Sequence, residues 1–242
     1  MRLSYRTRRL LAALVIAIVS LTALGRDMLQ QQSAPPAAVP GSPTTTMTPK
    51  PDVPAEGDAT AELSQLPVKG KAAKTGYTRT QFSNGWSRVG DCDIRNIILR
   101  RDIEKPEVDA QCKVVRGTLH DPYTGADIEF VRGPSTSDKI QIDHVVALSN
   151  AWQTGAQQIT PQERLSLAND PLNLLAVDGK ANQDKGDSDA ASWLPPHKQF
   201  RCQYVARQIA VKKLYKLWVT DAERRAMTQV LADCPGQRMP VQ

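Results

Sequence analysis

The chain has no Cys-x-x-Cys pair, only three histidines, no internal repeat and no glycine period. Zinc knuckles and zinc fingers need paired cysteines or histidines at short spacing, so the missing pairs argue against these classes. The missing glycine period excludes a collagen-like fibre. The one long apolar run, residues 10–24, is shorter than the roughly 20 apolar residues that cross a membrane. With 242 residues and 40% hydrophobic content, the chain has room for one ordinary domain and a further segment.

Charge is unevenly divided along the chain, although the formal net charge is +6. Residues 1–76 contain nine Lys and Arg and five Asp and Glu, a net charge of +4, which leaves +2 for residues 77–242. The part with folding potential is therefore nearly neutral. Net charge alone does not indicate nucleic-acid binding here, and any such affinity must come from a local basic patch.

The first 25 residues have the pattern of a secretory signal. Four arginines stand among the first nine residues and precede the apolar run, and the small residues Ala23 and Gly25 suit cleavage after Gly25. An uncleaved signal-anchor at residues 1–25 is the alternative. Both interpretations export the rest of the chain, because the basic flank stays inside. We expect a protein that is secreted or tethered to the outer face of the cytoplasmic membrane, with membrane contact only if the signal is uncleaved.

Residues 26–76 are expected to form a Pro/Thr-rich, disordered linker. Eight of the seventeen prolines and a run of three threonines lie between residues 31 and 76, with almost no large apolar side chains. Such a composition cannot bury enough apolar surface to offset the entropy lost on ordering. The sequence therefore predicts one folded domain, residues 77–242.

All four cysteines lie in that domain, at Cys92, Cys112, Cys202 and Cys234. An even number of cysteines in an exported protein indicates two disulfides, for which three pairings are possible. We favour Cys92–Cys112 and Cys202–Cys234, because each pair closes a short local loop. These bonds are expected to be structural.

The pattern of residues 77–242 predicts an α+β domain, with a few antiparallel strands and helices around them. The final helix is clearly marked, because Thr220 and Glu223 have the spacing of a capping box at its start. The expected helices cover 92–103, 145–152, a stretch from Pro161, 182–193, 200–218 and a final stretch after Thr220, and the expected strands cover 113–119, 128–132, 139–143 and 173–177.

A group of polar residues in the middle of the domain has the types that metal-assisted hydrolysis needs. Asp143 and His144 end an expected strand, Asn173 opens a later strand, and Asn182 follows nine residues further on, near the start of a helix. At a strand end, an Asp and a His can converge on one ion and its water. A neutral imidazole can act as a base at physiological pH, and Mg²⁺ needs only one or two protein oxygens.

A structural interpretation of the same residues stays open. Asp143 and His144 would then be a buried hydrogen-bonded pair, and the two asparagines would cap a strand and a helix. The other histidines, His120 beside a turn and His197 at a helix start, are expected at surface or capping positions.

Three segments taken in order resemble the HNH nuclease motif, a ββα-metal finger. They are residues 142–148 (IDHVVAL), residues 169–174 (NDPLNL) and Asn182 with the following 185–187 (KGD). The stretch from about Trp86 to Cys234 resembles exported HNH proteins related to the C-terminal domain of GmrSD-type restriction endonucleases. This resemblance implies an HNH core with additional N-terminal strands and a helix, and two C-terminal helices.

The resemblance also implies a role for each position. His144 would be the general base, Asp143 and Asn182 would hold a divalent metal, and Asn173 would orient His144 through backbone contacts. Because Asn182 stands where many HNH proteins have His, Mg²⁺ or Mn²⁺ is favoured over a softer metal.

Basic side chains near these residues are candidates for holding a phosphate backbone. Lys185 and Arg132 are the first choices. A stripe of Arg201, Lys212 and Lys216 is expected on the solvated side of its helix and is a weaker candidate.

The resulting hypothesis is an exported, metal-dependent HNH endonuclease that hydrolyses the phosphodiester bonds of nucleic acid, with DNA favoured over RNA and no stable protein partner. The alternative is a non-catalytic envelope protein with an HNH fold that binds nucleic acid or another polyanion. A metal-dependent phosphoesterase for small substrates is a third, weaker hypothesis.

Overall fold

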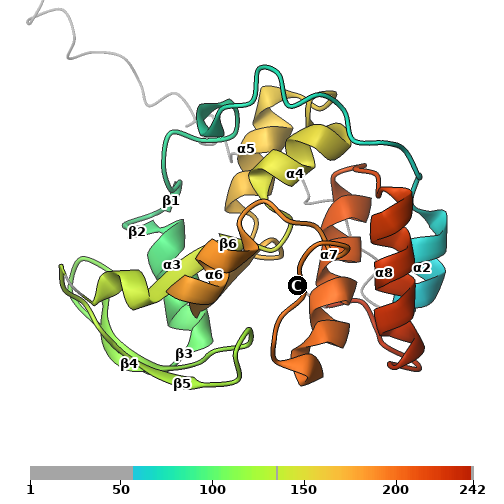
Figure 1. Ribbon diagram of the computed structural model, residues 1–242. Helices are drawn as coiled ribbons and strands as arrows, with labels where there is room; N and C mark the ends of the chain where they lie inside the picture. The colour runs from blue at the N-terminus through green and yellow to red at the C-terminus, as the bar shows by residue number, and fades with distance from the viewer. Residues whose placement is uncertain (1–56, 135, 241–242) are drawn as a thin grey trace, which may run out of the picture. The chain divides into compact units, whose positions relative to one another are not determined.

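The computed structural model describes residues 57–134 and 136–240 (Figure 1). The expected signal, residues 1–25, and the part of the expected linker up to residue 56 lie outside the described residues. Among the described helices, none is both long and apolar enough to cross a membrane.

The described residues form helices and strands in mixed order. In chain order they are α2 (Ala59–Gln65), the short 3₁₀ helix η1 (Arg79–Gln81), β1 (Arg88–Val89), β2 (Cys92–Asp93), α3 (Ile94–Asp102), β3 (Ile103–Val108), β4 (Val114–His120), β5 (Asp127–Val131), η2 (Ser137–Lys139), β6 (Ile140–His144), α4 (Leu148–Ala151), the π-helical turn η3 (Trp152–Ala156), α5 (Pro161–Asn169), β7 (Leu174–Asp178), α6 (Gly179–Lys185), η4 (Lys198–Phe200), α7 (Arg201–Leu214) and α8 (Asp221–Ala232).

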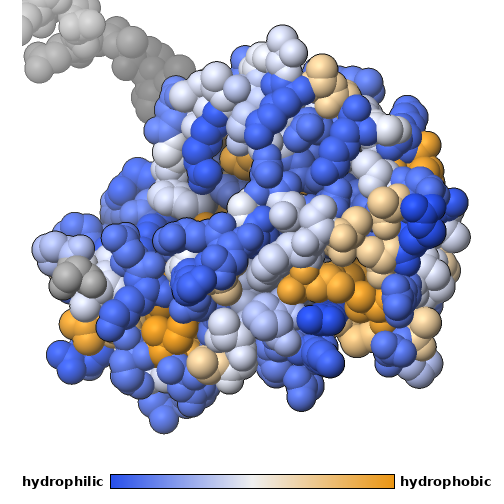
Figure 2. All heavy atoms as spheres, viewed as in Figure 1, coloured by the Kyte–Doolittle hydropathy of each residue, from blue (hydrophilic) through white to orange (hydrophobic). Residues whose placement is uncertain are grey.

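The strands form three small antiparallel sheets, β1-β2, β3-β4-β5 and β6-β7. In Figure 1, the β3–β5 sheet and α3 lie on one side of the molecule, and α7, α8 and α2 lie on the other. The mixed content of helices and antiparallel strands agrees with the predicted α+β class. The viewed face is mainly hydrophilic, with apolar residues gathered beside the C-terminal helices (Figure 2).

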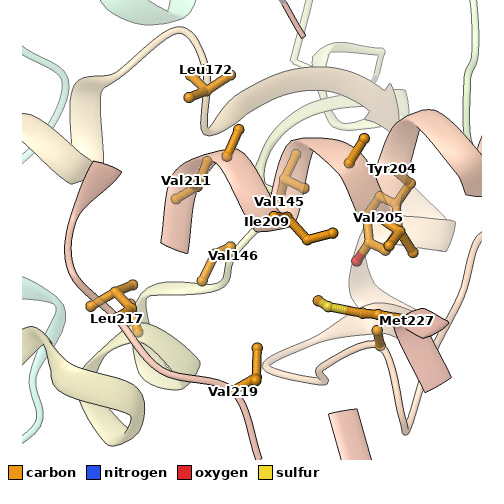
Figure 3. Packing of buried hydrophobic residues seen from close by; sticks show 14 of the residues in the cluster. Val145, Val146, Leu172, Tyr204, Val205, Ile209, Val211, Leu217, Val219 and Met227 are labelled. Atoms are coloured by element: carbon orange, nitrogen blue, oxygen red, sulfur yellow. The ribbon is translucent and has the colours of Figure 1, made fainter. Parts of the chain in front are cut away.

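The β6–β7 hairpin is buried on both faces and separates two apolar cores. The smaller core takes Ile140 and Ile142 from one face of the hairpin. The larger core takes Leu175 and Val177 from the opposite face. Figure 3 shows part of the larger core, including side chains from the segment that follows β6 and from α7. A strand end placed between two cores is a rigid position for polar side chains.

α6 follows β7 directly, and its first residue lies very close to η2. A Cβ atom at Gly179 would lie 2.1 Å from the carbonyl oxygen of Asp138, so only glycine lets the helix begin this close to η2. The Asp178 side chain caps the helix by accepting from the backbone N–H of Ala181. α6 therefore packs directly against the hairpin.

The folded part begins earlier than residue 77, the start that the sequence predicts. Asp58 caps α2 by accepting from the N–H groups of Thr60 and Ala61. Ala59, Leu63 and Leu66 are buried, and the helix packs against α7 and α8. The apolar stripe of this segment holds only these three residues. The composition of the segment therefore resembles that of a linker, although the spacing of the three residues is helical.

Residues 67–87, here called the crossing segment, run from α2 past α4 and α5 to β1 (Figure 1). Backbone bonds join Ala72 N to Gln153 O at 2.8 Å and Lys69 N to Val219 O at 3.1 Å. The Lys71 ammonium lies 2.9 Å from the Asp189 carboxylate. The crossing segment is thus part of the folded domain, although the sequence predicts a linker up to residue 76.

Other differences from the predicted elements have local causes. The helix expected at 182–193 is α6 and ends at Lys185, because Gly186 adopts a φ of +54°. The helix expected at 145–152 begins only at Leu148 and continues into η3. Strand β3, which contains Pro106, was not predicted.

The two disulfides are confirmed as Cys92–Cys112 and Cys202–Cys234. The first joins β2 to the turn before β4, and the second joins α7 to the end of α8. The capping box of Thr220 and Glu223 is also present at the start of α8.

Candidate active site

Asp143 and His144 lie at the end of β6, opposite Leu175 and Leu174 of β7. Neighbouring residues of a strand point to opposite faces. The Asp143 side chain accordingly contacts α6, and the His144 ring lies on the other face, beside Trp86 and Ala168. The sequence predicts that these two side chains converge on one ion. In the structure they lie on opposite faces of the strand instead.

The His144 imidazole is fixed by two contacts. Its Nε2 atom lies 2.9 Å from the carbonyl oxygen of Ala168, and the Trp86 ring is stacked on it, with centroids 5.9 Å apart and planes 9° apart. A carbonyl oxygen only accepts, so we assign the proton to Nε2, which leaves a lone pair on Nδ1.

Burial also keeps this imidazole neutral. Removal from water lowers the pKa of His144 from its usual 6.5 to about 3, a change that the Ala168 carbonyl opposes and the positive charges of Arg79 and Lys185 increase. At physiological pH the ring is therefore uncharged.

Asn173 holds the backbone that follows His144. Its Oδ1 accepts from Val146 N at 2.8 Å, and its Nδ2 donates to Val146 O and Leu167 O, both at 3.3 Å. Its own carbonyl accepts from Val145 N at 2.8 Å. These bonds bring the end of β6 and the end of α5 together, which is the kind of role that the family resemblance implies for Asn173.

Asp143 is buried and has two protein partners. The Tyr123 hydroxyl donates to Oδ2, and the Lys185 ammonium donates to Oδ1 at 2.9 Å. Burial raises the pKa of Asp143, and the charge of Lys185 and the hydroxyl of Tyr123 oppose this rise. Lys185 also donates to the carbonyl oxygen of His144 at 2.9 Å, so its ammonium occupies a position between two protein oxygens.

Asn182 lies one turn before Lys185 on α6 and contacts a different residue of β6. Its Nδ2 donates to Gln141 Oε1 at 2.8 Å. In residues 57–134 and 136–240, no three His, Cys, Asp or Glu side chains form a group that could hold a metal ion. Asp143 and Asn182 nevertheless carry side-chain oxygens of the kind that bind a hard cation. The position beside Asp143 is occupied by a cation of the protein itself, the Lys185 ammonium.

A cavity of about 100 Å³ opens at His144. Its walls come from two parts of the chain, and the lining residues are Arg79, Ser83, Gly85, Trp86, His144, Leu148 and Ala168. A larger hollow of about 440 Å³ lies beside the Cys202–Cys234 disulfide, but no histidine lines it. We place the candidate site in the smaller cavity, because it contains a neutral imidazole.

Sequence reasoning missed Arg79 and Trp86. Both stand more than 50 residues before His144, and only the fold brings them to the cavity. The one signal in the sequence was that the family resemblance begins near Trp86.

The structure contradicts the expected phosphate contacts of Lys185 and Arg132. Lys185 is buried against Asp143, so its ammonium cannot contact a phosphate from this position. Arg132 is half-buried and donates to Val114 O at 2.8 Å and Asn96 Oδ1 at 2.6 Å. These bonds tie the end of β5 to β4 and α3, which is a structural role.

The stripe expected on α7 is not a solvated face either. Lys212 is fully buried, and its ammonium lies 2.9 Å from the carboxylate of Glu223 and 3.0 Å from the carbonyl oxygen of Trp218. Arg201 donates to Pro195 O at 2.7 Å. Only Lys216 is exposed.

The remaining histidines lie outside the cavity. His120 is exposed and pairs with Glu104 and Asp127 on the neighbouring strands. His197 is half-buried, and its Nδ1 lies 3.3 Å from the carbonyl oxygen of Pro122.

Comparison with known proteins shows similarity to a family and to a secreted relative. Residues 90–230 match the model of the family described as "GmrSD restriction endonucleases, C-terminal domain". A protein of Arthroderma benhamiae, described as "Uncharacterized secreted protein", is 39% identical over 195 residues, which cover 80% of this chain and 92% of the relative. The stretch that matches this relative is longer than residues 90–242. It therefore begins before residue 90 and includes part of the chain that precedes the family match. No solved structure matches.

Proposed function

This chain belongs to the family of the GmrSD restriction endonuclease C-terminal domains, and from that premise we propose that it is an exported nuclease, with His144 as the general base. The observation that carries the proposal is the state of His144. A buried, neutral imidazole, fixed by a carbonyl and an aromatic ring, lines a cavity. Such an imidazole is neutral at physiological pH, and it can take a proton from the attacking water once a bound phosphodiester raises its pKa.

The proposed reaction uses the free Nδ1 of His144. The Ala168 carbonyl keeps the other nitrogen protonated, so Nδ1 accepts the proton of the attacking water. A bound phosphodiester carries negative charge, which favours the imidazolium and raises the pKa of His144 from its low value in the free protein. The products would be a 5′-phosphate and a 3′-hydroxyl, as the family resemblance implies.

A divalent metal, Mg²⁺ or Mn²⁺, is the second part of the proposal, with Asp143 as its ligand and Asn182 as the expected second ligand. The Lys185 ammonium already binds Asp143 Oδ1 and the His144 carbonyl oxygen, which supports a preference for a cation there. Lys185 has to withdraw before a metal can take this place. Because Asp143 and the His144 ring lie on opposite faces of β6, the end of the strand would also have to rearrange before the metal could neutralise charge on the oxygens of a phosphodiester in the His144 cavity.

The cleavage activity is tested directly. The purified full chain is incubated with supercoiled plasmid, linear duplex, single-stranded DNA and RNA, each with Mg²⁺, Mn²⁺ or EDTA. We expect metal-dependent cleavage that His144→Ala abolishes and His120→Ala, a change at an exposed histidine, leaves intact. No cleavage with any divalent metal, or cleavage that survives His144→Ala, contradicts the proposal. Retention of DNA without turnover would instead favour the non-catalytic envelope protein.

The metal site needs a separate measurement. Binding of Mn²⁺ is followed by electron paramagnetic resonance or calorimetry for the wild type, Asp143→Asn and Asp184→Asn. We expect Asp143→Asn to weaken binding at least tenfold. Asp184 is an exposed carboxylate of α6, the helix that carries Asn182, so its variant controls for general loss of charge. Equal binding by wild type and Asp143→Asn would contradict the metal assignment.

Export is proposed from the signal-like first 25 residues and agrees with the secreted relative. Detection of the protein in culture medium, in the membrane fraction and in the cytoplasm distinguishes secretion from tethering. Recovery in the cytoplasm alone would contradict both.

A further inference from the structure

The cavity at His144 has two walls of different origin. His144, Leu148 and Ala168 come from the region that matches the family, residues 90–230. The opposite wall, which includes Arg79 and Trp86, comes from the crossing segment, which precedes that region. The family domain alone therefore does not complete the cavity.

Arg79 supplies the positive charge of this cavity. It is exposed and is the first residue of η1. Within the described part of the chain, no carboxylate forms an ion pair with Arg79. Arg79 is the one charged side chain among the lining residues, so it is the one that can form an ion pair with an anion entering the cavity.

The turn that carries Arg79 is anchored by the residues that follow it. Phe82 is buried in the larger core, and the Arg164 guanidinium donates to Gln81 O at 3.0 Å. Further along, Ser87 N donates to Asn169 Oδ1 at 2.9 Å. Arg79 thus projects from a fixed backbone, which reduces the entropy lost when its side chain binds a ligand.

Gly85 lines the cavity without contributing a side chain. Its φ is +134°, a value that favours glycine, and no atom lies within 4 Å of the position of a Cβ. No side chain therefore narrows the cavity at this position.

We propose that Arg79 of the crossing segment binds the non-bridging oxygens of the phosphodiester that is attacked by the water from which His144 takes a proton. A guanidinium can donate two parallel hydrogen bonds to a phosphate, which orients it as well as attracting it. Trp86 acts beside it as a positioning residue, since its ring is stacked on His144. This inference rests on the proposed function for the reaction, but Arg79 binds phosphate whether or not the bond is cleaved.

The test measures binding separately from cleavage. Dissociation constants of the full-length wild type, Arg79→Ala, Arg79→Lys and Arg100→Ala for a fluorescent single-stranded DNA oligonucleotide are measured by anisotropy, in EDTA and at several salt concentrations. Arg100 is an exposed arginine of α3, and it serves as the matched control. Melting temperatures check that each variant folds.

We expect Arg79→Ala to weaken binding about tenfold or more, the range for one charged hydrogen-bonding group, and Arg79→Lys to recover part of the loss. The slope of log Kd against log salt should fall by about 0.7. Arg100→Ala should bind like the wild type. Equal affinity and slope for Arg79→Ala and wild type, or no binding by the wild type, would overturn the inference.

The same variants distinguish the two proposals in the cleavage assay. If the wild type cleaves and Arg79→Ala keeps its full kcat/KM, the inference about Arg79 fails and the nuclease proposal stands. If the wild type never cleaves but Arg79→Ala loses binding, the nuclease proposal fails and the phosphate contact stands.

Discussion

Replacing Asn173 by alanine should destabilise the domain strongly, because its side chain is fully buried and makes three hydrogen bonds. The change leaves the N–H of Val146 and the carbonyls of Val146 and Leu167 without these partners. Each such bond contributes about 1 kcal/mol, and a buried group left unpaired costs about 1–3 kcal/mol. We expect a loss of about 3 kcal/mol in the free energy of unfolding.

The assay is urea unfolding at pH 7.5, followed by circular dichroism and supported by melting curves. A loss of this size lowers the melting temperature by roughly 6–12 °C for a domain of this length. Asn84→Ala, at an exposed asparagine, is the matched control and should change stability by less than about 0.5 kcal/mol.

Asn173→Asp sharpens the test, because it keeps the shape and removes both donors. One carboxylate oxygen still accepts from Val146 N–H, but the other faces the carbonyl oxygens of Val146 and Leu167. Protonation of the carboxyl restores one donor, so the stability of this variant relative to wild type should recover as the pH falls towards 4. A deficit in stability that does not change with pH, or an Asn173→Ala variant as stable as wild type, would refute the reasoning.

Three further predictions concern stability. Lys212→Met should lower the free energy of unfolding in urea by about 3–5 kcal/mol, because it leaves the Glu223 carboxylate buried without its cation. The double variant Lys212→Met/Glu223→Leu should recover most of this loss. A double variant as unstable as the single one would contradict the prediction. Replacing Cys202 and Cys234 together by serine should cost about 3–4 kcal/mol from the loop of 32 residues that their disulfide closes, and an unchanged melting temperature would count against it. Because burial lowers the pKa of His144 to about 3, the unfolded chain takes up a proton below about pH 6.5 that the folded chain does not. The free energy of unfolding should therefore fall by roughly 2 kcal/mol between pH 6.5 and pH 5. His144→Gln should lack this part of the pH dependence, and an unchanged pH dependence in that variant would contradict the explanation.

The elements that the sequence predicted well depend on local signals. Pro161 stands at the first turn of α5, and Thr220 with Glu223 starts α8. Asp143 and His144 end a strand, as the sequence predicted, and in the structure this strand pairs with the one that follows Asn173. In each case the determining residues lie within a few positions of one another, so no tertiary information was needed.

The contacts of the candidate site depend on tertiary packing and could not be predicted in this way. Burial of Lys212 requires Glu223 from the next helix, and a lysine in a helical stripe is usually solvated. Lys185 faces Asp143 because α6 crosses the end of β6 at that turn. Arg79 reaches the cavity only through the path of the crossing segment, about which the composition of that segment says nothing.

That path has a consequence for how such domains are cut and compared. A fragment excised at the limits of the family match, residues 90–230, would keep His144 and its hairpin but lose one wall of the cavity and the arginine in it. Under our inference, reaction and recognition are then encoded in separate stretches of the chain. Exchange of the crossing segment between relatives would therefore change the affinity for phosphate while the hairpin that carries His144 stays unchanged.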